Sequence, residues 1–158
     1  MCYEEIKVYA LNEDQMERTL RFFDNAEFFF CTKRPDTITI GKKRTILSNS
    51  VGLIYEGEVI GLGKILDYRK NLYSTIQLAF SKQDYYESEL AEQLFRGFID
   101  YVTLKTYYSK IIIEVYSFNI ELIKLCDRVG FQRKGILRNK VYKYGNYFDV
   151  YIYEYEED

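Results

Sequence analysis

Residues 119–131 read NIELIKLCDRVGF and hold the clearest structural signal in the chain. Asn119 is among the residues that most favour the N-cap of a helix, where its side chain accepts a backbone hydrogen bond. Gly130 suits the left-handed conformation that ends a helix, and Phe131 then falls where a Schellman motif places an apolar contact with the last turn. The pattern therefore predicts a capped helix over residues 120–129.

Extended segments lie on both sides of this helix. Residues 111–116 are rich in β-branched side chains, which indicates a buried strand. Residues 135–144 and 147–155 are rich in tyrosine and are joined at Gly145-Asn146, a sequence typical of a hairpin turn. We therefore expect one strand before the helix and a hairpin after it.

Three more strands are expected upstream. Residues 51–55 and 59–66 flank Glu56-Gly57-Glu58, as the two strands of a hairpin flank their turn. In residues 74–81, apolar and polar side chains alternate with the period of a strand. These segments predict three consecutive strands.

A long helix is expected next, because Leu90, Leu94 and Phe98 recur at helical spacing. We predict Asp84 as its N-cap, with Glu87 three positions later. Carboxylates there accept hydrogen bonds from free backbone N–H groups and match the positive end of the helix dipole.

The N-terminal part of the chain predicts one strand and one helix. Residues 6–10 alternate like a strand. Asn12 and Gln15 form the pattern of a capping box, which starts a helix over residues 13–23.

Residues 24–49 give no such pattern, and we interpret them as a loop with short helical or extended pieces. Phe28-Phe29-Phe30 within them predicts either an apolar wall or part of the core. Lys42-Lys43-Arg44 is interpreted as a solvated loop rather than as a phosphate contact, because most short charge runs are solvated.

The composition indicates a globular protein. With 158 residues and no linker-like stretch, the chain matches the size of one domain, so we predict a single domain over residues 1–158. Its residues are 47% hydrophobic and 18% aromatic, which supplies a packed core and argues against disorder. The net charge of −2 gives no general attraction to phosphate backbones, so no nucleic-acid partner is expected.

The cysteines and the lack of histidine limit the chemistry. Cys2, Cys31 and Cys126 are odd in number and unevenly spaced, which favours free thiols in a cytoplasmic protein over disulfides. No apolar run approaches the ~20 residues of a membrane helix, so no membrane partner is expected. Without histidine, a Ser-His-Asp triad, a Cys-His pair and a His-bearing zinc site are excluded, and we expect no metal.

The order of these elements is strand, helix, irregular segment, three strands, helix, strand, helix and two strands. It resembles the GNAT superfamily of acetyl-CoA-dependent N-acyltransferases, over nearly the whole chain, and within it the branch related to ribosomal-protein N-terminal acetylases. The motifs that carry the resemblance are Asn119 with Gly130-Phe131, Glu56-Gly57-Glu58-Val59-Ile60-Gly61, Phe23-Asp24-Asn25-Ala26-Glu27, Gly135-Ile136-Leu137-Arg138 and Gly145-Asn146-Tyr147-Phe148-Asp149. The resemblance implies a mixed α+β fold with a mostly antiparallel sheet of about six to seven strands, splayed between the fourth and fifth strands.

The resemblance also implies where acetyl-CoA, the acyl donor, binds. In the family its pyrophosphate lies on the N-terminus of the long helix, where free N–H groups and the helix dipole attract anions. Backbone amides of the strand beside the splay hold the thioester carbonyl, as an oxyanion hole does. The residues that this assigns to acetyl-CoA are Leu78, Ala79, Phe80, Tyr85, Tyr86, Glu87, Ser88 and Asn119.

The sequence departs from the family in the pyrophosphate loop. The usual Arg/Gln-x-x-Gly-x-Gly/Ala pattern falls on residues 84–89, DYYESE, which contain no glycine and three carboxylates. Glycine allows a close approach of backbone to phosphate, and carboxylates repel its charge. This loop favours the alternative function, a GNAT-like binding module without catalysis.

The sequence offers several candidates for the acid that protonates the leaving thiolate. Many family members carry Tyr on the helix seven residues after the Asn, and this position is Cys126 here. A thiol has a pKa near that of the departing group and can donate a proton, but a cysteine on an apolar helix face is more often a core residue. Tyr116, Tyr85 and Tyr86 are the alternatives.

Glu114 is the leading candidate for the general base, because a carboxylate on the strand beside the splay can accept the proton of an attacking amine. Its alternative role is that of an outward-facing strand residue in a salt bridge. We therefore predict an acetyl-CoA-dependent N-acyltransferase that acts on a small-molecule amine or a peptide N-terminus by direct transfer. The tyrosine-rich last hairpin predicts a surface suited to a homodimer.

Overall fold

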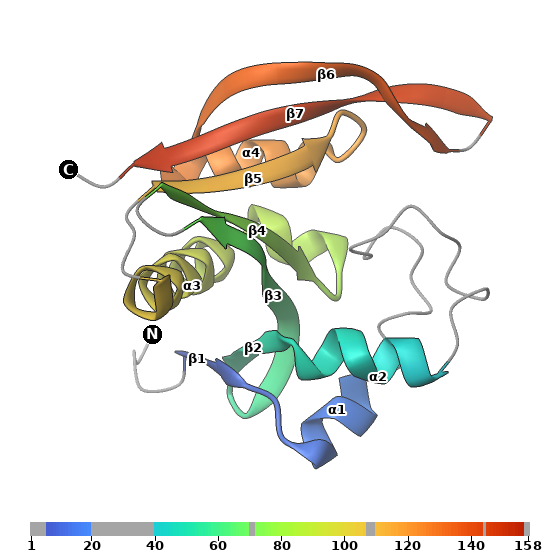
Figure 1. Cartoon of the computed structure of the whole chain (residues 1–158). Helices are drawn as coiled ribbons and strands as arrows, with labels where there is room; N and C mark the ends of the chain where they lie inside the picture. Colours follow the sequence, from blue (N-terminus) through green and yellow to red (C-terminus); the bar gives the residue numbers. More distant parts are fainter. Residues whose placement is uncertain (1–5, 20–39, 70–71, 107–109, 144, 157–158) are drawn as a thin grey trace.

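The computed structural model describes residues 6–19, 40–69, 72–106, 110–143 and 145–156 (Figure 1). Its elements, in chain order, are β1 (Ile6–Ala10), α1 (Glu13–Thr19), α2 (Ile40–Ser48), β2 (Ser50–Tyr55), β3 (Glu58–Arg69), β4 (Tyr73–Phe80), the 3₁₀ helix η4 (Gln83–Glu87), α3 (Glu89–Thr106), β5 (Lys110–Tyr116), α4 (Ile120–Val129), β6 (Gln132–Lys143) and β7 (Asn146–Glu156). The expected order of strands and helices is confirmed in these ranges, and α2 adds a helix to the region interpreted as loop.

The strands form one seven-stranded sheet in the order β1-β2-β3-β4-β5-β7-β6. Only β4 and β5 run parallel, while the other neighbouring strands are antiparallel. Figure 1 shows β4 and β5 close together at one end and diverging toward the other. The predicted α+β fold with a splay between the fourth and fifth strands is therefore confirmed.

The parallel ladder between β4 and β5 is short. Its three bridges pair residues 74–76 with residues 111–113, and its last bridge joins Ile76 to Ile113. Beyond that bridge β4 continues to Phe80 and β5 to Tyr116 without pairing to each other. The two strands thus present unbridged edges to one another where they diverge.

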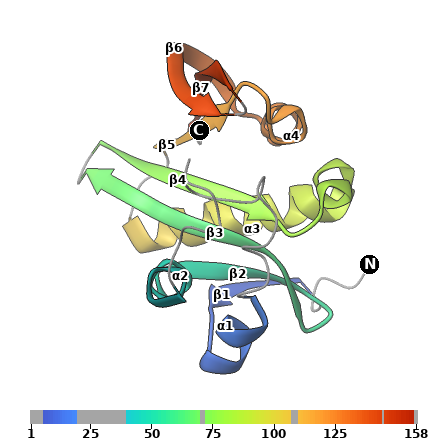
Figure 2. The same cartoon turned by 90° about the vertical axis from the view of Figure 1, so that its right-hand side faces the viewer.

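Helices cover both faces of the sheet, with α3 and α4 on one side and α2 on the other (Figure 1 and Figure 2). Ile76 and Phe80 of β4 and Ile113 of β5 are buried with Phe98 of α3 in the main core. Burial of each such side chain contributes about 1.5–3 kcal/mol. A smaller cluster on the other face joins α2 to β3 and β4 through Leu47, Leu62 and Ala79.

The predicted caps of α4 and α1 are confirmed. Asn119 Oδ1 accepts from the Leu122 N–H at 3.4 Å. Gly130 has a φ of 108°, and the Phe131 N–H donates to the Cys126 carbonyl at 2.9 Å, as a Schellman motif requires. In α1, Asn12 and Gln15 exchange the two hydrogen bonds of a capping box, at 2.8 and 3.1 Å.

The prediction that Asp84 caps the long helix is wrong. Asp84 lies inside η4, and α3 begins only after it, at Glu89. The residue that caps α3 is Ser88, whose Oγ accepts from the Ala91 N–H at 3.2 Å. Most of the acidic loop therefore forms the 3₁₀ helix η4 ahead of α3, whereas the sequence pattern had merged the two into one helix.

The interpretation of Lys42-Lys43-Arg44 as a loop is also wrong, because these residues lie within α2. Arg44 forms ion pairs with Glu13, at 3.7 Å, and with Glu17, both on α1. Its partners lie far upstream in the chain, so the run gives no local sign of them. Phe28-Phe29-Phe30, like the predicted last turn of α1, lies outside the described residues.

Candidate functional site

The end of β4 directs backbone amides toward β5. The Ser81 N–H donates to the Ile60 carbonyl of β3 at 2.8 Å. Because successive N–H groups of a strand point to opposite sides, those of Leu78 and Phe80 point toward β5. The Phe80 N–H donates to Tyr86 Oη at 3.0 Å. Leu78 lies past the last bridge to β5, so its N–H is not part of the β4–β5 ladder. The Leu78 amide is thus a donor placed where the strands diverge.

The facing part of β5 presents polar side chains on the α2 side of the sheet. Val115 is buried in the main core, so Glu114 and Tyr116 on either side of it point to the opposite face. Glu114 is exposed and Tyr116 is half-buried. The Tyr116 ring stacks on Phe118, with centroids 5.3 Å apart, and Phe118 meets Phe148 edge-on at 4.9 Å. A carboxylate therefore lies beside an aromatic cluster.

The N-terminus of α3 is partly satisfied by the chain's own groups. Ser88 Oγ, which accepts from Ala91, also donates to the Tyr85 carbonyl at 2.6 Å. The buried Tyr86 ring meets Phe80 edge-on, with centroids 5.2 Å apart. One of the first-turn N–H groups that an anion would need is therefore already used.

Arg128 of α4 joins α4 to η4 and to the start of α3. Its Nε donates to Glu92 Oε1 of α3 at 2.7 Å, and its Nη2 donates to the Tyr86 carbonyl in η4. Beside it, Gln83 Nε2 donates to Glu121 Oε1 of α4 at 2.7 Å. Sequence reasoning missed these contacts, because they join residues 36 to 42 positions apart and follow no short motif.

The charge around η4 and the start of α3 is mainly negative. Asp84, Glu87 and Glu89 are exposed, and the Lys82 ammonium lies 6.0 Å from the centre of the Tyr85 ring. These carboxylates would repel a pyrophosphate bound at the start of α3, although solvent screens the repulsion.

The two places to which the resemblance assigns acetyl-CoA differ in how well they suit that ligand. Where the resemblance places the thioester, the Leu78 amide points into the divergence from β4, whereas Glu114 stands on the α2 face of β5. At the pyrophosphate end, α3 offers the N–H groups of Glu89 and Leu90, which have no partner inside the helix. The carboxylates and the lack of glycine there make the second end the poorer match.

Cys126 does not share this exposed region. Its side chain is 0% exposed and lies in the main core. Burial, reinforced by the nearby charge of Asp127, raises the pKa of the Cys126 thiol far above its ordinary value. The placement favours the packing role given above as the alternative to proton donation.

The structure brings together only some of the residues expected at the site. Leu78, Glu114 and Tyr116 lie around the divergence, while Tyr85, Tyr86, Glu87 and Ser88 form η4 and the cap of α3. Asn119 uses its side chain as the cap of α4, and Ala79 packs under α2.

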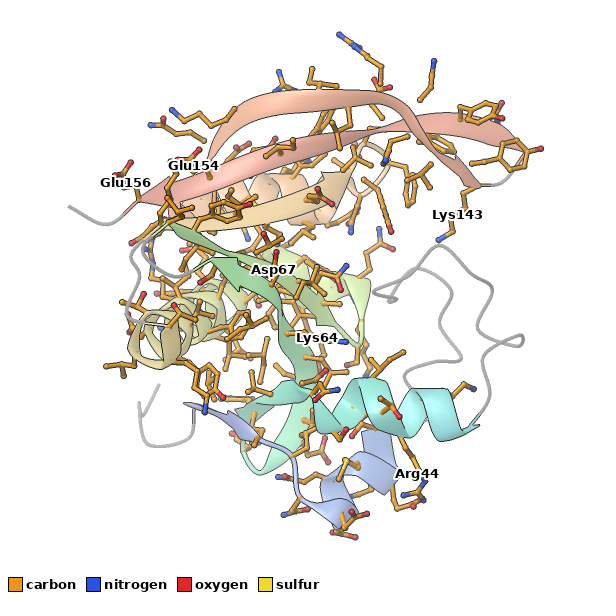
Figure 3. All side chains as sticks on the ribbon, viewed as in Figure 1. Arg44, Lys64, Asp67, Lys143, Glu154 and Glu156 are labelled. Atoms are coloured by element: carbon orange, nitrogen blue, oxygen red, sulfur yellow. The ribbon has the colours of Figure 1, made fainter. Side chains whose placement is uncertain are left out.

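A hollow of about 230 Å³ lies elsewhere, lined by Gly130, Gln132, Lys134, Glu154 and Glu156. Figure 3 shows Glu154 and Glu156 at the end of the sheet where β4 and β5 are close, away from the divergence. Within the described ranges, no group of three or more Cys, Asp or Glu residues is arranged to hold a metal ion. No helix in those ranges is long and apolar enough to cross a membrane.

Residues 50–152, more than half of the chain, match a family model described as an acetyltransferase (GNAT) domain. A search of curated protein sequences finds no match.

Solved structures of acetyltransferases share the fold. RimL, a ribosomal L7/L12 alpha-N-protein acetyltransferase in complex with coenzyme A, has a TM-score of 0.81 at 13% identity, covering 98% of this chain and 95% of that one. The spermidine N-acetyltransferase of Vibrio cholerae, in complex with CoA and spermine, has a TM-score of 0.80 at 16% identity, covering 97% and 96%. A GNAT-family acetyltransferase from Bacillus anthracis has a TM-score of 0.78 at 13% identity, covering 96% and 95%.

Proposed function

This chain belongs to the GNAT acetyltransferase family, and we propose that it transfers an acyl group from acetyl-CoA directly to an amine where β4 and β5 diverge. The observation that carries the proposal is the placement of the Leu78 amide on one strand and the Glu114 carboxylate on the other, just past the last bridge. RimL and the spermidine acetyltransferase, both in complex with CoA, support acetyl-CoA as the donor.

The residues of the divergence take three roles. Acetyl-CoA supplies the acyl group as a thioester. The Leu78 N–H donates to the carbonyl oxygen as negative charge develops on it. Glu114 accepts the proton of the attacking amine, directly or through water, and Tyr116 on the same face of β5 donates a proton to the leaving thiolate.

The acceptor is a small-molecule amine or a peptide N-terminus, in line with RimL, an alpha-N-protein acetyltransferase, and with the spermidine N-acetyltransferase. The five motifs quoted above support the branch related to ribosomal-protein N-terminal acetylases. The free thiol of Cys126 supports a cytoplasmic location. The exposed rings of Tyr142 and Tyr147 on the β6–β7 hairpin support the predicted homodimer surface.

A second candidate is a binding module without catalysis. It is favoured by one observation, the acidic and glycine-free region from Asp84 to Glu89, in which Ser88 occupies an N–H group of the helix N-terminus. In this candidate the fold persists while the affinity for acyl-CoA is lost.

Titration with acetyl-CoA separates the two candidates. We expect heat of binding in calorimetry and a rise in melting temperature, because a ligand at 100 times its Kd stabilises the native state by about 2.7 kcal/mol. Release of free thiol in the presence of an amine panel then measures transfer. No binding of acetyl-CoA or of longer acyl-CoAs at millimolar concentration excludes the transferase and leaves the binding module.

A further inference from the structure

Three side chains form a row across the diverging part of the sheet. Lys64 of β3 pairs in register with Gln77 of β4. Glu114 is the residue of β5 that follows the last bridge, so it lies beside Gln77 on the next strand. A cation, an amide and a carboxylate therefore follow one another across three neighbouring strands.

All three side chains lie on the face that carries α2. A Cβ on Gly63 would meet the Phe98 ring of α3 at 2.7 Å, so the neighbouring Lys64 points to the opposite face. Leu62, two residues earlier, packs with Leu47 of α2. Figure 3 shows where Lys64 lies on β3. Lys64 thus shares the face on which Glu114 is proposed to accept a proton.

Within the part of the chain that the structure describes, Lys64 and Glu114 have no partner of opposite charge. Lys64 is nevertheless half-buried. Asp67 lies on the same face, but in register with the part of β4 that is still bridged to β5. Lys143 differs from Lys64, because its ammonium lies over the Phe118 ring, 5.3 Å from the centroid.

The spacing of the two charges suits a small zwitterion. Lys64 and Glu114 are separated by one strand, so their backbones are at least about 10 Å apart. In an α-amino acid the nitrogen and the carboxylate oxygens are about 3 Å apart. With a charged hydrogen bond of about 2.8 Å at each end, such a molecule needs about 9 Å between the Lys64 ammonium and the Glu114 carboxylate, and two long side chains on one face of the sheet can lean toward each other to that distance.

We propose that Lys64 is a specificity-determining residue that binds a carboxylate next to the acceptor amine. The acceptor class is then an α-amino acid, with its nitrogen at Glu114 and its carboxylate at Lys64. A polyamine is disfavoured, because its second cation would meet the Lys64 ammonium. The inference rests on the proposed function, since it places the acceptor at the same Glu114.

The experiment compares each L-amino acid with its carboxamide, which keeps the amine but loses the negative charge. We expect wild-type kcat/KM to favour the acid at least 10-fold for the preferred side chain, because the carboxamide loses the charged hydrogen bond to Lys64. In Lys64→Met, which keeps the apolar stem, this preference should fall below about 3-fold. In Lys64→Glu it should reverse in favour of the carboxamide and of spermidine.

Lys124→Met is the matched control, because Lys124 is exposed on α4 away from the row. Its preference should equal that of the wild type. A wild-type preference for carboxamides or spermidine, or an unchanged preference in Lys64→Met, overturns the inference. Circular dichroism confirms that each variant is folded.

Binding of the same acids and amides, measured by calorimetry without acetyl-CoA, separates this inference from the proposed function. If no variant turns over any acceptor, the proposed function fails. Amino-acid binding that is lost in Lys64→Met still supports the role of Lys64 in that case. Absence of such binding in the wild type overturns it.

Discussion

The divergence between β4 and β5 and the N-terminus of α3 are adjacent parts of one family fold, but they differ in what holds them. The divergence depends on backbone geometry. The β4–β5 ladder stops at Ile76, and the Leu78 amide, two residues later, points toward β5 without pairing to it. The α3 N-terminus depends on side chains, with Ser88 as its cap and Arg128 joining it to α4. A site made of backbone geometry is kept wherever the fold is kept, with little dependence on sequence. A site made of side chains is readily altered by substitutions.

This difference predicts that the largest loss of activity comes from the divergence. Glu114→Gln removes the proposed proton acceptor and should lower kcat/KM by about 100-fold or more, as loss of a general base commonly does. Because Glu114 is exposed, the melting temperature of the Glu114→Gln variant should stay near that of the wild type. Steady-state kinetics with Glu58→Gln, an exposed residue at the β2–β3 turn, as the control measures the effect. Equal activities in the two variants would mean that the base lies elsewhere.

The second prediction concerns the attachment of η4 to α4. Arg128→Met removes the pair with Glu92 and the bond to the Tyr86 carbonyl. The side chains of Arg128 and Glu92 are 33% and 29% exposed, so we expect a loss of only about 1–2 kcal/mol of unfolding free energy. The KM for acetyl-CoA should rise more than kcat falls. Denaturant unfolding and kinetics test this, and a variant as stable as Lys124→Met would show that the contact is not structural.

The third prediction uses the pH dependence of stability to test whether Cys126 of α4 is a core residue. The folded state raises the pKa of Cys126, so it disfavours the thiolate, and stability is complete below the unfolded pKa of about 8.5. Above that pH the unfolded chain ionises first, and stability falls by up to about 1.4 kcal/mol per pH unit. Unfolding at pH 8 and pH 9.5 should show this slope in the wild type and a smaller one in Cys126→Ala. The same slope in both would place the titration on another group.

The smallest effect is expected from the exposed carboxylates of the α3 N-terminus. The double variant Glu87→Gln with Glu89→Gln should lower the KM for acetyl-CoA by about 3-fold at low salt. Near 1 M salt the gain should vanish, because the Debye length falls to about 3 Å. Asp100→Asn, also exposed on α3, is the control. No gain at low salt would mean that the pyrophosphate lies away from these side chains.

The sequence predicted the elements whose signals are local. Asn119 and Gly130 cap α4 through bonds that reach no more than a few residues, so their types alone indicate its ends. The start of α3 was not marked by a local signal, and the predicted cap Asp84 gave way to Ser88. Both are favoured cap residues, and the Arg128 contact with η4 comes from 42 residues away.

The site was less predictable, because it depends on which way side chains face. The position of Cys126 seven residues after Asn119 is visible in the sequence, but its burial appears only once α4 is packed on the sheet. Lys64 lies on β3 between two register shifts, near Leu53 and near Ile65. Such bulges change the face of every later residue, and no short motif marks them here.

From the three-bridge ladder between β4 and β5 we expect a consequence for folding. Three of its four isoleucines, Ile76, Ile111 and Ile113, are at most 1% exposed, so packing rather than ladder length joins the halves of the sheet. Until α3 is formed and β5 docks, β4 is an open edge with apolar residues. Such an edge is a template for pairing with another chain. We therefore expect the chain to be most prone to aggregate in the interval after the first four strands have formed and before the fifth has docked.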